Sequence, residues 1–181
     1  MYIPIILGTA REGRESEKVA RFMLEKAIEF GLESEIIDVR NFRHEATDNT
    51  KTSDQARRFK EKVLKAEGLI IVSPEYNHGY PGELKMMLDM LYEEYSGKPV
   101  GICGVSSGVF GGARMIEQLV QICVFLHMVP IGEVVNFSRV QDLFDENGAI
   151  KKESYHDRAR KFLGVLTGYA ETLSCGKDAK S

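Results

Sequence analysis

Residues 104–114, GVSSGVFGGAR, contain a pattern that two different chemistries use. The first five of these residues match the G-x-S-x-G turn, which exposes a nucleophilic serine between a strand and a helix. In a hydrolase of this kind Ser106 is the nucleophile, and Asp142 or Asp145 and then His156 follow in the expected chain order. In the alternative interpretation, the glycine-rich turn presents backbone amides to a bound cofactor and contains no nucleophile. This segment alone is compatible with both chemistries.

A second candidate for chemistry is the segment 8–18, GTAREGRESEK, which follows the first apolar run. Hydroxyl groups, a guanidinium and the free amides at the start of a helix together bind phosphate groups. In this segment Thr9 and Ser16 provide hydroxyls, and either Arg11 or Arg14 provides the guanidinium. The segment is not a P-loop, because it lacks the required G-K-[S/T]. The alternative is that Ser16 only caps the following helix and that the arginines lie in water.

The segment 73–85, SPEYNHGYPGELK, is the third candidate. It is rich in turn-forming residues, it contains Tyr76 and Tyr80, and a proline begins the helix that follows. Such a loop offers backbone amides for the polar edge of a planar heteroaromatic ring and aromatic side chains for its face. The alternative is an ordinary turn in which the tyrosines have no functional role.

Strands and helices alternate along the chain and must position these three segments. Apolar runs predict strands at 2–7, 34–39, 68–73, 98–105 and 131–135. The spacing of apolar residues predicts helices at about 16–30, 53–66, 81–95, 112–127 and 153–172. This alternation predicts an α/β fold, a flavodoxin-like three-layer sandwich with a five-stranded parallel sheet in the order 2-1-3-4-5 and helices on both faces.

The predicted sheet brings the three candidate segments together. In a parallel sheet, every turn from a strand into a helix lies at the carboxyl edge, and ligands bind where the strand order reverses. The candidate segments follow the first, third and fourth strands, which are neighbours in the predicted order. We therefore expect the segments to form a single site at this edge.

The predicted third helix, at 81–95, has an apolar stripe at helical spacing, formed by Leu84, Met87, Leu88, Leu91 and Tyr95. Met86 and Met90 lie beside this stripe. These two methionines either belong to the core or widen the stripe into a contact between subunits.

Composition argues against several classes of function. Of the 181 residues, 43% are hydrophobic and 28% are charged, and the net charge is −3. We therefore expect no binding to nucleic acid or to a membrane surface, and no apolar run is long enough to span a bilayer. The chain has three cysteines without a C-x-x-C pair, and its histidines have no ligand spacing. These observations favour the reducing cytoplasm and argue against a metal site.

The length suits a single domain, which we place at residues 1–173, followed by a flexible tail at 174–181. The polar segment 41–52 is predicted to be a surface loop. The N-terminal segment lacks the basic start and the cleavage site of a signal peptide.

The candidate segments, extended to GTAREGRESEKVA, PEYNHGYPGELK and SSGVFGGARMIEQLVQ, resemble the loop motifs of the NADPH-dependent FMN reductase family. That family consists of flavodoxin-like flavoproteins and includes quinone, azo and chromate reductases. The resemblance covers most of residues 3–130 in the right order. The first segment departs from the common motif G-S-x-R-x-x-S, because Thr9 replaces the serine and two extra residues separate Arg11 from Ser16.

The resemblance implies an FMN site, residue by residue. Its phosphate would be held by Thr9, Arg11, Ser16, Lys18 and the amide of Val19, with Glu17 contributing only through its backbone. Its ring would be lined by Pro74, Glu75, Tyr76 and Asn77, and its other side would be closed by Ser106, Ser107 and Gly108. The extra length of the first segment leaves open whether Arg11 or Arg14 faces the phosphate. His78 lies either at the edge of the ring or only in the turn.

The activity implied by the resemblance is an FMN-dependent oxidoreductase that passes hydride from NADPH through FMN to a flat acceptor, such as a quinone, an azo compound or free flavin. The cofactor carries this chemistry, so no side chain is predicted to act as acid, base or nucleophile. The resemblance also implies a homodimer or homotetramer. The alternative is a flavodoxin-like electron carrier, which the missing T-x-T-G-x-T pattern argues against. The hydrolase is less favoured, because GVFGG delays the helix after Ser106.

Overall fold

A parallel sheet forms the centre of the computed structural model, which describes residues 1–43, 45 and 51–178, without the side chains of 175–178. The strands follow the order β2-β1-β3-β4-β5, as predicted, and β6 also pairs with β4. Their bounds are β1 Ile5–Leu7, β2 Ile36–Asp38, β3 Leu69–Pro74, β4 Pro99–Val105, β5 Val129–Pro130 and β6 Val135–Phe137. All of these pairings are parallel.

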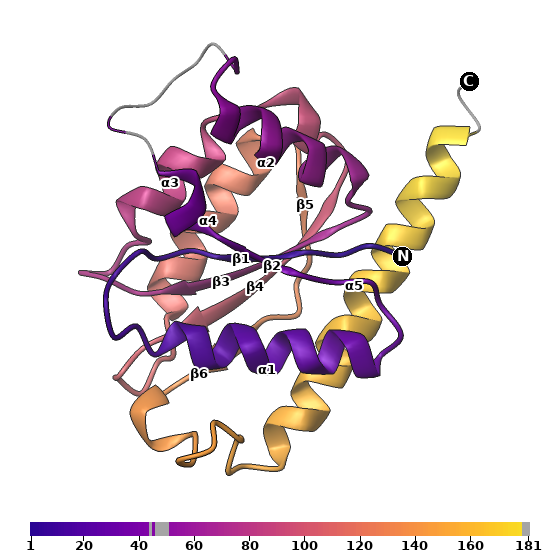
Figure 1. The fold of residues 1–181 in the computed structure, drawn as a ribbon. Helices are drawn as coiled ribbons and strands as arrows, with labels where there is room; N and C mark the ends of the chain where they lie inside the picture. Colours follow the sequence, from indigo (N-terminus) through magenta and orange to yellow (C-terminus); the bar gives the residue numbers. More distant parts are fainter. Residues whose placement is uncertain (44, 46–50, 179–181) are drawn as a thin grey trace.

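Helices cover both faces of the sheet (Figure 1). Their bounds are α1 Ser16–Glu29, α2 Asp54–Lys65, α3 Gly82–Leu88, α4 Ala113–Phe125 and α5 Ser154–Asp178, with short 3₁₀ turns η1 Val39–Phe42, η2 Glu93–Tyr95 and η3 Val140–Asp142. Alternate residues of the central strands point to opposite faces. Ile71 packs with α2, α3 and α4, whereas Ile70 and Val72 pack with α1 and α5. Burial on both faces explains why β3 and β4 are continuously apolar.

The predicted fifth strand, at 131–135, is wrong in its bounds, because two short segments share that position. Val100 pairs with Pro130 in β5, but Cys103 pairs with Val135 in β6. Two extra residues therefore interrupt the ladder beside β4. Pro130 has no N–H to continue the hydrogen bonds, and the N–H of Ile131 donates to the Val100 carbonyl at 3.0 Å before the chain leaves the sheet.

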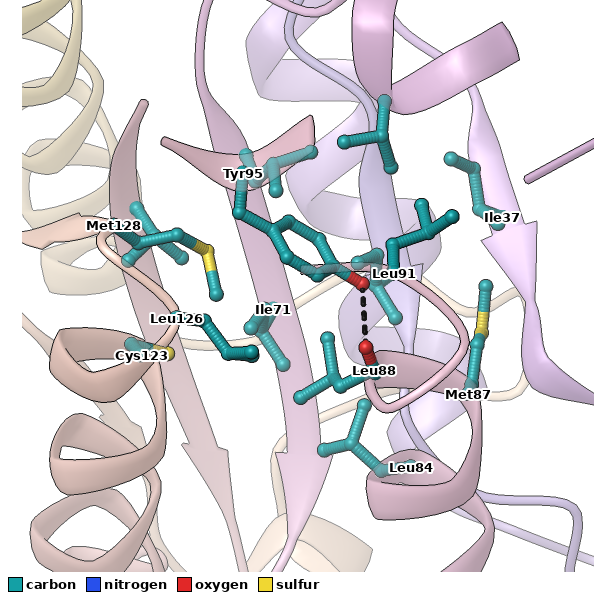
Figure 2. Close-up of a cluster of buried hydrophobic side chains, with 14 of the residues drawn as sticks. Ile37, Ile71, Leu84, Met87, Leu88, Leu91, Tyr95, Cys123, Leu126 and Met128 are labelled. Atoms are coloured by element: carbon teal, nitrogen blue, oxygen red, sulfur yellow. Dashed lines mark hydrogen bonds between the residues drawn. The ribbon is translucent and has the colours of Figure 1, made fainter. Parts of the chain in front are cut away.

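The third helix is shorter than predicted and ends at Leu88 rather than near Tyr95. In a continuing helix the Leu88 carbonyl would accept from the N–H of Tyr92, but this N–H donates to the Glu94 carboxylate at 3.1 Å. The Leu88 carbonyl instead accepts from the Tyr95 hydroxyl at 3.1 Å (Figure 2). The predicted stripe is nevertheless fully buried, because the chain folds back over the same core.

The two methionines beside the stripe have different positions. Met90 is 3% exposed and belongs to the core, whereas Met86 is only partly buried. The core interpretation therefore holds for Met90.

Other boundaries agree closely with the expectations or lie outside the described chain. Ser53 caps α2, and its hydroxyl accepts from the N–H of Ala56 at 3.2 Å. Helix α5 continues to Asp178, so it includes part of the segment assigned to the tail, because no proline interrupts it. Residues 44 and 46–50 of the predicted surface loop, and 179–181 of the tail, lie outside the described residues.

Candidate functional site

The loops that follow β1, β3 and β4 meet at the carboxyl edge of the sheet, where they enclose a cavity of about 380 Å³. Its lining residues are Arg11, Glu12, Gly13, Arg14, Glu15, Ser16, Pro74, Glu75, Tyr76, Val105, Ser106, Ser107 and Val140. The pairing of β3 with both β1 and β4 brings these loops together. The expected single site at this edge is therefore present.

The Arg14 guanidinium forms all of its hydrogen bonds with other groups of the protein. Its side chain is 3% exposed, and it donates to the Thr9 carbonyl and to both carboxylate oxygens of Asp38. Its Nε and Nη2 also donate to Glu17 at 3.3 Å. The hydrogen bond with Asp38 is the main cause that raises the pKa of Arg14. Every N–H donor of this guanidinium is occupied, so none remains for a ligand.

Arg11 is the arginine of this loop that remains available. Its guanidinium lies over the Tyr76 ring, 5.4 Å from the ring centroid. Within the described part of the chain, no carboxylate forms an ion pair with it. Of the two arginines that the sequence left open, the geometry therefore favours Arg11 as the one that faces an anion.

Ser16 is the first residue of α1, and it is one of the residues that line the cavity. The residue is 2% exposed, and its Oγ has no hydrogen-bond partner among the described residues. Ser16 therefore does not cap the helix, which was the alternative interpretation; the cap position is Glu15. A buried unpaired hydroxyl at a helix N-terminus fits an absent anion, because a phosphate oxygen would satisfy both the hydroxyl and the helix amides.

Thr9 lies beneath the cavity rather than in its lining. The residue is fully buried, and its hydroxyl is 3.1 Å from the Tyr76 hydroxyl and 3.2 Å from Glu83 Oε1. Burial tends to raise the pKa of Glu83, but hydrogen bonds, including one from the Ala10 N–H at 2.8 Å, lower it overall. Thr9 thus joins the first loop to the second.

The remaining residues of the predicted phosphate site are not among those that line the cavity. Glu17 binds Arg14 and Arg21, the Lys18 ammonium binds Glu15 at 2.8 Å, and the Val19 side chain is buried in the core. The contribution of the Val19 amide stays a prediction.

Asn77 and His78 form the tip of a tight hairpin in the second loop. Tyr76 and Gly79 exchange two backbone hydrogen bonds of 2.9 Å, and the φ angles of Asn77 and His78 are +50° and +67°. Positive φ at both central residues defines a type I′ turn. Both side chains are exposed and neither lines the cavity, so the turn interpretation holds for His78.

Glu75 connects the second loop to the third. Its carboxylate accepts from the N–H groups of Arg114 and Met115 at 3.2 and 3.4 Å, in the first turn of α4. The Arg114 guanidinium lies 3.8 Å from the same carboxylate. An acidic side chain at a helix N-terminus is stabilised by the helix dipole. The carboxylate therefore ties the second loop to the start of α4, and Glu75 is also one of the residues that line the cavity.

The third loop does not form a nucleophile elbow. Ser106 and Ser107 line the cavity, but the Ser106 hydroxyl donates to the Gly108 carbonyl at 3.3 Å. No histidine in the described chain hydrogen-bonds to Ser106, and the His156 ring packs instead against Phe22, 5.4 Å away. Gly108 is itself outside the lining. Without a general base the serine is not activated.

Among the residues at this edge that the sequence argument missed are Asp38, Arg40, Glu83 and Val140. Asp38 is the last residue of β2, and a polar residue at the carboxyl end of a parallel strand is a signal that could have identified it. Glu83 lies inside the second candidate segment, where it resembles an ordinary first-turn acid.

Residues 1–142 match the family described as NADPH-dependent FMN reductase. An NAD(P)H-dependent FMN reductase of Pseudomonas aeruginosa is 36% identical over 121 residues, which cover 64% of this chain and 65% of that protein, less than two thirds of its length. A quinone reductase of Escherichia coli K12 is 33% identical over 133 residues, covering 70% of this chain and 71% of the relative.

Solved structures share the fold. The flavoenzyme NAD(P)H:(acceptor) oxidoreductase FerB of Paracoccus denitrificans superposes with a TM-score of 0.79 at 20% identity, covering 94% of this chain and 97% of that one. A flavodoxin of Streptococcus pneumoniae superposes with a TM-score of 0.60 at 16% identity, covering 93% and 99%. The predicted flavodoxin-like fold is confirmed. Among the described residues, no helix combines the length and apolarity needed to span a bilayer.

Proposed function

This chain belongs to the NADPH-dependent FMN reductase family, and on that premise we propose that it uses NAD(P)H and FMN to reduce a flat small-molecule acceptor of the quinone class. The observation that carries the proposal is the cavity in which Arg11, Tyr76 and Ser106 meet. Relatives are named FMN reductases and quinone reductases, which supports the same class of reaction.

The first loop would hold the FMN phosphate. Arg11 and Ser16 both line the cavity, Ser16 begins α1, and its hydroxyl has no hydrogen-bond partner among the described residues. A hydrogen bond to a charged group contributes about 1.5–3 kcal/mol, so a few such contacts are enough to retain a phosphate. Glu15 pairs with Lys18, which reduces its repulsion of the anion.

The second and third loops would hold the ring. Pro74 and Tyr76 of the second loop and Ser106 and Ser107 of the third loop line the cavity. Bound FMN supplies the redox chemistry, namely hydride uptake from a reduced nicotinamide and hydride delivery to the acceptor. The residues of the chain orient the ring and exclude water from its buried side, and none acts as a nucleophile.

Flavin binding tests the site. Arg11→Ala is expected to weaken FMN binding by about 10- to 100-fold, because one charge-assisted contact with the phosphate is lost. Riboflavin has no phosphate, so its affinity is expected to change by less than about twofold. Quenching of flavin fluorescence measures both affinities. Arg160→Ala is the matched control, because Arg160 is exposed on α5 and pairs only with Asp157 in the described chain.

Turnover distinguishes the enzyme from the electron carrier. NADPH added to the FMN-loaded protein without air is expected to bleach the flavin, and a quinone should then restore the colour. A carrier would bind FMN but stay yellow. A protein that remains colourless after FMN addition and desalting would contradict the proposal. Esterase activity lost in Ser106→Ala would support the hydrolase instead.

We further propose that the protein self-associates through a surface that we call the α3–α4 face, formed by Tyr92, Val124 and Phe125 together with the lining of a cavity of about 590 Å³ between α3 and α4. Phe125 is 71% exposed, and its ring centroid lies 5.9 Å from that of Tyr92. The ion pair of Lys85 with Asp89 borders the cavity, so the face carries both charges and can complement a second copy of itself.

We also propose that the protein is located in the cytoplasm. Cys103 and Cys123 are buried free thiols on opposite faces of the sheet, which suits a reducing compartment.

A further inference from the structure

Three carbonyl oxygens of the first loop accept hydrogen bonds from the guanidinium groups of two arginines, Arg14 and Arg40. Arg14 donates to the carbonyl of Thr9. Arg40 donates through Nε to the carbonyl of Ala10 at 3.2 Å and through Nη2 to the carbonyl of Arg11 at 2.5 Å. Three consecutive carbonyls are therefore occupied by guanidinium groups.

Asp38 contacts both of these arginines, Arg14 through its guanidinium and Arg40 through its backbone N–H. It is the last residue of β2 and pairs in register with Leu7, the last residue of β1, so it lies where the first loop leaves the sheet. Its carboxylate binds the Arg14 guanidinium through both oxygens and accepts a hydrogen bond from the backbone N–H of Arg40 at 3.0 Å, which fixes where the Arg40 side chain begins. Burial tends to raise the pKa of Asp38, but the hydrogen bond from Arg14 and those that follow it lower the pKa overall. The Asp38 carboxylate is therefore ionised at neutral pH. We call the unit formed by Asp38, Arg14 and Arg40 the clamp.

When these carbonyls are held on one side of the loop, the peptide N–H groups are directed to the other side. In a trans peptide, the N–H of the next residue points away from the carbonyl. The N–H groups of Ala10 and Arg11 are used within the loop, by Glu83 and by the Thr9 hydroxyl. The N–H that follows the Arg11 carbonyl belongs to Glu12, and Glu12 lines the cavity. The clamp also keeps the negative ends of three carbonyl dipoles away from an anion in the cavity.

We propose that Arg14 and Arg40, organised by Asp38, are positioning residues that fix the first loop in the form that binds a phosphomonoester. This inference rests on the proposed function, since FMN is the phosphomonoester in question. Neither arginine supplies the guanidinium that meets the phosphate: the donors of Arg14 are all occupied, and Arg40 is outside the cavity lining. Arg11 has that role, and its backbone is what the clamp holds.

Asp38→Asn separates positioning from direct contact. If the clamp positions the loop, this variant weakens FMN binding by about tenfold or more while riboflavin affinity changes by less than about twofold. If Arg14 bound the phosphate directly, Asp38→Asn would release its guanidinium and leave FMN binding equal or stronger. Arg14→Lys keeps the charge but loses the bidentate fork, and it is expected to match Asp38→Asn. The double variant should be no more than about twofold weaker than either single variant, because both break one unit.

Controls keep the result interpretable. Arg160→Lys is the matched exposed substitution, and circular dichroism with urea unfolding reports whether each variant folds. If Asp38→Asn does not fold, Arg40→Lys provides the test, because Arg40 is exposed and holds two of the carbonyls. An unchanged ratio of FMN to riboflavin affinity in folded variants would overturn this inference alone. A wild-type protein that binds no flavin would overturn the proposed function and this inference together.

Discussion

A buried hydroxyl without a partner marks the point where the site is incomplete without a ligand. Ser16 Oγ is enclosed by protein, yet no described group hydrogen-bonds to it. Burying such a group without a partner lowers the free energy of unfolding by about 1–3 kcal/mol, and a bound anion would supply the missing hydrogen bond. The Ser16 hydroxyl is therefore expected to strengthen the binding of an anion while it destabilises the ligand-free protein.

Ser16→Ala is expected to separate these two effects. The variant should bind FMN about 10- to 100-fold more weakly, because a hydrogen bond to a charged phosphate is lost. Its ligand-free form should be as stable as the wild type or more stable by up to about 1 kcal/mol, since no hydroxyl remains unsatisfied. Fluorescence titration and urea unfolding measure the two effects. Ser174→Ala, at an exposed position of α5, should change neither.

At this scale the sequence identifies which residues meet, but not which of their groups are free. Thr9, Arg11, Ser16 and Glu75 all occur in segments that the predicted strand order brings together, and the structure places these segments around one cavity. The availability of Arg11 rather than Arg14 depends on Asp38, which lies 24 residues further along the chain than Arg14. Local spacing contains no signal of such a contact.

At the scale of elements, the clearest difference between prediction and structure is the end of α3. The apolar stripe continues through Leu91 and Tyr95, so its period predicts one long helix. The structure ends α3 at Leu88: the N–H groups of Met90 and Leu91 donate to carbonyls only three residues back, and the Tyr92 N–H donates to the Glu94 carboxylate. Both Leu91 and Tyr95 stay buried, so periodicity cannot distinguish a helix from a chain that folds back over the same core.

Glu94 also links η2 to α2, and its pKa predicts a pH dependence. Burial tends to raise this pKa, but hydrogen bonds from backbone N–H groups and from Lys60, with the charge of Lys51 nearby, lower it from 4.5 to about 2. Because the folded pKa is depressed, the stabilisation is fully present above about pH 5 and is lost as the pH falls toward 2.

Glu94→Gln tests this linkage by urea unfolding at several pH values. The variant is expected to be less stable than the wild type by up to about 3 kcal/mol at pH 7, and the difference should shrink to nearly zero at about pH 2. A difference that stays constant with pH would show that ionisation of Glu94 is not its source. Glu146→Gln, at an exposed position with no ion pair in the described chain, is the control.

At the scale of the whole molecule, two exposed aromatic residues, Tyr92 and Phe125, lie together on the α3–α4 face. Phe125→Asp places a charge at the centre of this face and is expected to weaken self-association by at least about tenfold. Light scattering should give the wild type a multiple of the 20.3 kDa chain mass, and the variant should move toward one chain. Tyr169→Asp on α5 is the matched control, because Tyr169 is also an exposed aromatic residue. A wild type that is monomeric at micromolar concentrations would contradict the proposal.

The interrupted strand beside β4 limits how two copies can meet. An uninterrupted outer strand offers a row of unpaired N–H and carbonyl groups, on which a strand of another chain can continue the sheet. Here the outermost position is divided into β5, with two residues that include Pro130, and β6, with three. A neighbouring chain finds too few consecutive donors and acceptors there to add a strand. At this edge, the discontinuity therefore hinders the addition of a strand from another chain to the sheet.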